Sequence, residues 1–154
     1  MDMSESDSAE LRVFVYGTLQ PGGRYHQRYC GYLSEAVPAM VKGRLYDFPA
    51  LGYPAMTAGE DWVKGYLLRF CQSAAICEQV LRGLDWLEGY ERDRPASQNN
   101  YQRCQKQIFD TDYRPLPSAW AYEMDMVNVR RYGGVYLPGG QWPCPRRKTQ
   151  EENL

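Results

Sequence analysis

The sequence of 154 residues contains a single histidine, His26, and no CxxC pair. A structural zinc site needs clustered thiolates or imidazoles, so this scarcity argues against one, and we expect no metal. The cysteines are odd in number and widely spaced, which is typical of reduced thiols in the cytoplasm rather than of a disulfide framework. They are Cys30, Cys71, Cys77, Cys104 and Cys144.

An excess of either charge is also lacking, because 18 Lys and Arg residues face 19 Asp and Glu residues, for a formal net charge of −1. Such a balance provides no general field for nucleic acid or for an anionic membrane surface. No hydrophobic run is long enough to span a bilayer, and the polar start MDMSESDSAE is unlike a secretory signal. We therefore expect a cytoplasmic protein that binds neither nucleic acid nor membrane. The sequence leaves the oligomeric state open.

Apolar and aromatic residues are plentiful, with a hydrophobic fraction of 44% and 13 tyrosines. A chain of this length and composition suits one domain with its own core. We expect that domain over residues 11–144, preceded by a disordered leader at residues 1–10 and followed by a flexible tail at residues 145–154.

Segments with the pattern of strands outnumber helical ones. The predicted strands are residues 11–16, 40–46, 62–70, 101–109 and 118–124. Residues 48–56 contain two prolines and a glycine and are predicted to form a turn, and a short helix is predicted within residues 25–33. One longer helix is predicted from Ser73 to Glu88. Because helices do not alternate with strands, we expect an α+β domain with a curled or barrel-like sheet.

The predicted helix carries one carboxylate on its apolar side. At about 100° per residue from Ile76, the apolar residues occupy an arc that ends near 140°, and Glu88 falls inside it at about 120°. Asp85 and Glu78 fall outside the arc, at about 180° and 200°. Burial and the negative end of the helix dipole should both raise the pKa of Glu88, as a general acid/base requires. Alternatively, Glu88 turns outward at the helix end, into solvent or a salt bridge.

The segment VFVYGTLQPGG begins as a strand and ends as a turn. A glycine such as Gly17 at this point suggests that another group approaches the backbone closely. Beyond the last ladder hydrogen bond, free backbone N–H groups and the Thr18 hydroxyl could hold a carboxylate or a polarised carbonyl oxygen. Alternatively, Gly17 serves only the dihedral angles of a tight turn.

The strand followed by YGTL and the helix end LDWLEG together resemble the gamma-glutamylcyclotransferase-like superfamily, which includes gamma-glutamylamine cyclotransferases and the plant AIG2-like proteins. The similarity covers residues 11–142. It is carried in order by VFVYGTLQPGG, VKGRLYDFPALGYPAM, VKGYLLRF, LRGLDWLEGYE, YQRCQKQIF, SAWAYEM and YLPGGQW. The resemblance implies a small mixed β-barrel flanked by a few helices, with a cavity at one end.

The resemblance also implies site residues and a reaction. Glu88 corresponds to the acid/base of the family. The substrate-binding positions are Tyr16, Gly17, Thr18, Leu19 and Tyr122, with Tyr53 and Pro54 as a further wall. In the implied reaction, the α-amine of a γ-glutamyl group attacks its own γ-carbonyl and releases 5-oxoproline and an amine, without a cofactor. The substrate is a small γ-glutamyl molecule, whether an amino acid, an amine or another conjugate, and glutathione ranks lower.

Two other functions remain open. The same fold could bind a small acidic metabolite without converting it. His26 and Cys30 are four residues apart and would share a helix face, as a nucleophile and its base could. Since no orienting carboxylate or nucleophile elbow surrounds them, a structural thiol is the favoured interpretation of Cys30.

Overall fold

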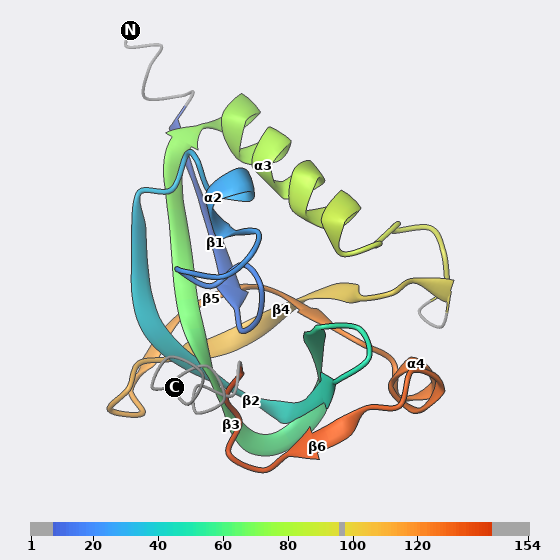
Figure 1. Ribbon diagram of the computed structural model, residues 1–154. Helices are drawn as coiled ribbons and strands as arrows, with labels where there is room; N and C mark the ends of the chain where they lie inside the picture. Colours follow the sequence, from blue (N-terminus) through green and yellow to red (C-terminus); the bar gives the residue numbers. More distant parts are fainter. Residues whose placement is uncertain (1–7, 96–97, 143–154) are drawn as a thin grey trace, which may run out of the picture.

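The computed structural model (Figure 1) describes residues 8–95 and 98–142. Within these residues six strands and three helices follow one another. They are β1 (Ser8–Val15), α2 (His26–Tyr29), β2 (Glu35–Phe48), β3 (Tyr53–Ser73), α3 (Ala74–Leu87), β4 (Gln102–Phe109), β5 (Pro115–Glu123), α4 (Met126–Arg131) and β6 (Val135–Leu137). The domain is therefore α+β, as predicted, and none of the described helices has the length and apolar character to span a membrane.

The strands form a loosely closed ring. β3 pairs with β1 and β2 along much of its length, and β4 pairs with β5, all antiparallel. Two narrower contacts complete the ring: Val13 of β1 pairs with Trp120 of β5 in parallel, and Met40 of β2 pairs with Phe109 of β4. The short β6 adds to β2. The predicted small mixed barrel is confirmed, although single residue pairs close it at two places.

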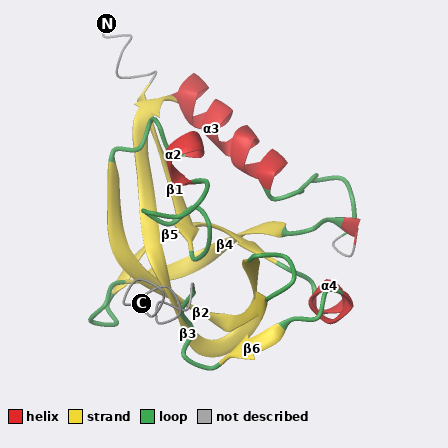
Figure 2. Cartoon of the chain, in the orientation of Figure 1, coloured by secondary structure: helices red, strands yellow, loops and turns green. Residues whose placement is uncertain are grey.

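The end of β1, residues 13–15, is buried on both faces, which explains why its sequence alternates imperfectly. Val13 and Val15 belong to one core cluster, together with residues of α3. Phe14 belongs to the second cluster, on the opposite face of β1. In Figures 1 and 2, α2 and α3 lie on the same side of the long strands, whereas α4 lies apart, near β6. The strand thus ends between two packed layers, and the chain that follows it is held from both sides.

Hydrogen bonds at both ends fix the length of α3. At its start, the Ser73 hydroxyl accepts a hydrogen bond of 3.2 Å from the Ile76 N–H, as an N-cap residue does. At its end, the Tyr90 N–H donates to the Asp85 carbonyl at 2.9 Å and the Gly89 N–H to the Trp86 carbonyl at 3.2 Å. This pair of bonds is a Schellman motif, with Gly89 at the left-handed position (φ 67°).

Several strands are longer than predicted, and the predicted turn is shorter. β1 begins at Ser8, so residues 8–10, which we had assigned to the leader, pair with residues 71–73 of β3. The turn predicted over residues 48–56 ends at Gly52, because residues 53–56 pair with β2. α4 and β6 are too short to give a periodic pattern, and the sequence did not predict them. Residues 1–7 of the expected leader and the expected tail, 145–154, lie outside the described residues.

Candidate active site

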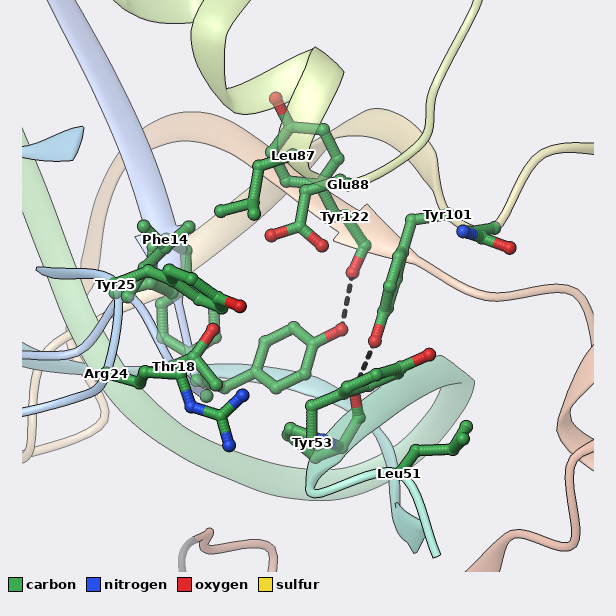
Figure 3. Close-up of a pocket in the computed structure, with 16 residues that line it drawn as sticks. Phe14, Thr18, Arg24, Tyr25, Leu51, Tyr53, Leu87, Glu88, Tyr101 and Tyr122 are labelled. Atoms are coloured by element: carbon green, nitrogen blue, oxygen red, sulfur yellow. Dashed lines mark hydrogen bonds between the residues drawn. The ribbon is translucent and has the colours of Figure 1, made fainter. Parts of the chain in front are cut away.

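A cavity of about 210 Å³ opens where the end of β1, the end of α3 and the turn between β2 and β3 meet (Figure 3). All the residues that the sequence analysis assigned to a site line this cavity. They are Tyr16, Gly17, Thr18, Leu19, Glu88 and Tyr122, with Tyr53 and Pro54. The remaining lining residues are Phe14, Val15, Arg24, Tyr25, Leu51, Leu87, Asn100 and Tyr101.

Glu88 lies at the C-cap of α3, and its carboxylate points into the cavity (Figure 3). The Schellman motif that ends the helix holds the Glu88 backbone in place. Among the described residues, no donor hydrogen bonds to the Glu88 carboxylate and no cation pairs with it. The side chain is only partly exposed, and loss of hydration raises its pKa from 4.5 to about 8. Glu88 therefore exchanges a proton near neutral pH, in a cavity large enough for a small molecule.

In the turn after β1, the carbonyl groups of Gly17 and Thr18 accept hydrogen bonds, whereas the amides of residues 17–19 have no acceptor among the described residues. The Gly17 carbonyl accepts from the Gln20 N–H at 3.0 Å, and the Thr18 carbonyl accepts from the Tyr25 N–H at 2.9 Å. The Gln20 side-chain amide anchors the turn to the Trp142 carbonyl at 2.6 Å. Within the described part of the chain, the backbone N–H groups of residues 17–19 donate to no acceptor. Because residues 17–19 line the cavity, their amides are candidate donors to an anionic group.

Gly17 is needed for a close approach of Pro54. A Cβ atom on Gly17 would lie 2.9 Å from both Cδ and Cγ of Pro54. No real Cβ contact is this short, so any side chain at position 17 would displace the turn or the proline ring. The ring of Pro54 thus packs against the backbone of the turn, and both residues line the cavity.

Two buried tyrosines line the cavity with hydroxyls that are already hydrogen-bonded. The Tyr16 hydroxyl donates to the Tyr122 carbonyl at 2.7 Å and accepts from the Met56 N–H at 3.1 Å. The Tyr101 hydroxyl donates to the Pro54 carbonyl at 2.5 Å. Burial raises the pKa of both hydroxyls well above its usual value, so both stay protonated. These tyrosines hold the cavity wall in position. Because each hydroxyl already donates its proton to a backbone carbonyl, neither is suited to proton transfer in a reaction.

Tyr122 connects the cavity to an ion pair that sequence analysis missed. Its hydroxyl donates to Asp85 Oδ1 at 2.7 Å, and Arg103 Nη1 lies 3.1 Å from Asp85 Oδ2. The Arg103 guanidinium also stacks over the Trp120 ring, 4.5 Å from its centre. The helical pattern had assigned Asp85 to the solvent face, but its side chain is only 20% exposed. This network fixes the last turn of α3, which carries Glu88.

The polar loop after α3 is held by an almost completely buried asparagine. Asn99 is 1% exposed, and its amide group bonds both the N–H and the carbonyl of Glu91 at 3.1 Å. It also accepts from Arg94 Nε at 2.8 Å. This places the neighbouring Asn100 in the cavity wall. No sequence signal distinguished Asn99 from the other polar residues of the loop.

The alternative pair of His26 and Cys30 finds no support in the structure. His26 Nδ1 lies 2.8 Å from the Leu19 carbonyl, and neither residue lines the cavity. Burial raises the pKa of the Cys30 thiol to about 11, which disfavours the nucleophilic thiolate. No group of three or more His, Cys, Asp or Glu side chains in residues 8–95 and 98–142 is placed to hold a metal ion.

Comparison with known families agrees with this geometry. The model of the family described as gamma-glutamyl cyclotransferase, AIG2-like, matches residues 13–144. The chain belongs to this family. The match includes the turn after β1, all of α3 and the cavity between them. No curated protein sequence matches the chain.

Several solved structures share the fold of this chain at low sequence identity. An AIG2-like protein from Mus musculus superposes with a TM-score of 0.62 and 19% identity, over 87% of this chain and 88% of that one. A protein from Arabidopsis thaliana gives 0.59 and 19%, over 94% and 76% of the two chains. YkqA from Bacillus subtilis gives 0.58 and 20% over 87% of this chain, which spans only 40% of YkqA. At these identities the likeness shows the fold alone.

Proposed function

We propose that the protein is a γ-glutamyl cyclotransferase that converts a γ-glutamyl amide or γ-glutamyl amino acid to 5-oxoproline and a free amine. Glu88 is the general acid/base, and the free amides of residues 17–19 bind the substrate. The observation that carries the proposal is that an unpaired carboxylate, with its pKa raised to about 8, lines the same cavity as three unpaired backbone amides. Membership of the family supports the reaction class.

The first half of the reaction forms the ring. The Glu88 carboxylate takes a proton from the α-ammonium group of the substrate, and the free amine attacks the γ-carbonyl carbon. A new carbon–nitrogen bond closes the five-membered ring, and the carbonyl electrons move onto oxygen. Because both reacting groups belong to one molecule, holding the substrate folded supplies much of the rate enhancement. The amides of residues 17–19 and the Thr18 hydroxyl provide the donors for this binding.

The second half releases the leaving amine. The tetrahedral intermediate collapses as its oxygen re-forms the carbonyl, and the bond to the leaving nitrogen breaks. Glu88, now a carboxylic acid, donates its proton to that nitrogen. The regenerated carboxylate then takes the second proton from the positively charged ring nitrogen and passes it to the released amine, which departs as an ammonium ion. One carboxyl group thus serves both proton transfers in sequence, which requires a pKa near the working pH.

The test compares wild-type protein with Glu88→Gln on a panel of γ-glutamyl amino acids and γ-glutamyl amines, with 5-oxoproline as the product measured. We expect the substitution to lower kcat by about 10²- to 10⁴-fold, because it removes the group proposed to transfer both protons. The exposed Glu91 lies three residues further along, and Glu91→Gln should retain full activity as a matched control. Thermal unfolding of both variants shows whether they fold. If wild-type protein forms no 5-oxoproline from any member of the panel, the cyclotransferase proposal is wrong and a non-catalytic binding module is favoured.

A further inference from the structure

Arg24 is an exposed residue at the rim of the cavity. In Figure 3 its guanidinium lies across the cavity from Glu88. It also extends toward the turn between β2 and β3, since a Cβ atom on Gly52 would lie 3.5 Å from Arg24 Nη2. The guanidinium therefore stands at the solvent side of the cavity, where the outer part of a bound molecule would lie.

Among the described residues no carboxylate pairs with Arg24. Its guanidinium stacks over the Tyr25 ring, 5.6 Å from the ring centre, and its N–H donors bond to no acceptor in the described part of the chain. These donors form a planar fork that matches a carboxylate group. An unpaired fork of this kind at a cavity rim points to an anionic group on the ligand.

The charges of the residues that line the cavity also favour an anionic ligand. Arg24 is the one cation and Glu88 the one carboxylate among the lining residues. Glu88 is mostly protonated below pH 8, so the empty cavity carries about one positive charge at neutral pH. A γ-glutamyl derivative of a simple alkylamine has no net charge, whereas a γ-glutamyl derivative of a neutral amino acid has one negative charge. The γ-glutamyl derivative of an amino acid, with its negative charge, therefore complements the positive charge of the cavity.

We propose that Arg24 binds the carboxylate of an amino-acid leaving group, so that γ-glutamyl amino acids are preferred over γ-glutamyl amines. This inference rests on the proposed function. The amides of residues 17–19 already offer donors for the α-carboxylate of the γ-glutamyl part. The fork of Arg24 is then left for a second carboxylate, and only a γ-glutamyl amino acid among these two classes has one.

The experiment uses γ-glutamylalanine and γ-glutamylethylamine, which differ only by the carboxylate of the leaving group. Arg24→Gln should lower kcat/KM about tenfold on γ-glutamylalanine and less than about twofold on γ-glutamylethylamine, since it removes one charge-assisted contact. Arg24→Lys should retain part of the preference, because the charge remains while the fork is lost. Arg28→Gln is the matched control: Arg28 is also exposed and stacks over Tyr29, but it does not line the cavity.

The binding of the same two compounds to the Glu88→Gln protein separates this inference from the proposed function. Calorimetry should show tighter binding of γ-glutamylalanine, and loss of that difference in the Arg24→Gln, Glu88→Gln double variant. Equal affinities, or no binding of either compound, would overturn the role of Arg24. Equal losses of kcat/KM on both substrates would also overturn it and assign Arg24 to the α-carboxylate. Absence of 5-oxoproline from wild-type protein refutes the cyclotransferase instead.

Discussion

The raised pKa of Glu88 should make the free energy of unfolding depend on pH in a way that Glu88→Gln removes. The native protein keeps the Glu88 proton up to about pH 8, whereas the unfolded chain loses it near the ordinary value of 4.5. Between these values the native state binds more protons than the unfolded state. Its stability therefore falls as pH rises through this window and levels off above about pH 8.

The size of the effect follows from the same two values. Each pH unit between the native and unfolded pKa corresponds to about 1.4 kcal/mol, so a pKa raised from 4.5 to about 8 sets an upper limit of about 5 kcal/mol. Because the side chain keeps some exposure in the cavity, we expect about 2 to 4 kcal/mol between pH 5 and pH 8. Glutamine has nearly the same shape and does not titrate. The variant should thus gain stability over the wild type by this amount as pH rises.

Urea unfolding of both proteins at several pH values from 5 to 9 measures the difference directly. Other titrating groups are the same in the two proteins, so their contributions cancel. Glu91→Gln, at an exposed carboxylate, should follow the wild-type curve at every pH. If the stability difference between Glu88→Gln and wild type stays constant to within about 0.5 kcal/mol across this range, Glu88 is not a desolvated carboxyl group in the native protein.

Two further predictions concern catalysis and the turn. Since Glu88 must be ionised to accept the first proton, kcat/KM should rise about tenfold per unit below pH 8 and level off above it, and a flat profile from pH 6 to pH 8 would contradict the role of Glu88. Gly17→Ala should lower kcat/KM and cost about 1 to 3 kcal/mol in unfolding free energy, because its Cβ meets Pro54. Gly31→Ala is the control for the second prediction, since nothing lies within 4 Å of a Cβ at Gly31, and equal effects of the two substitutions would argue against a close fit at Gly17.

Much of the fold could be predicted because its signals are local. The apolar arc of α3 depends on residues within the helix itself, and it was found from the sequence. The ends of the strands were harder to predict from the sequence. β2 and β3 are longer than predicted because they pair with each other across a turn, and pairing stabilises polar residues that have no strand pattern of their own. Tertiary pairing, rather than local preference, sets those boundaries.

The same distinction between local signals and tertiary contacts explains which residues of the site could be predicted from the sequence. Glu88 was visible because a carboxylate on an apolar helix face breaks a periodic pattern. Asp85 and Arg103 were not visible, because an acidic residue on a polar face and an arginine in a strand are both ordinary until the fold brings them within 3.1 Å. Arg24 is a similar case, in a loop whose sequence gives no direction to its side chain. A residue that breaks a pattern can be detected alone, whereas one that completes a contact depends on a partner elsewhere in the chain. The substrate preference proposed for Arg24 therefore required the structure, whereas Glu88 could be proposed as the acid/base from the sequence alone.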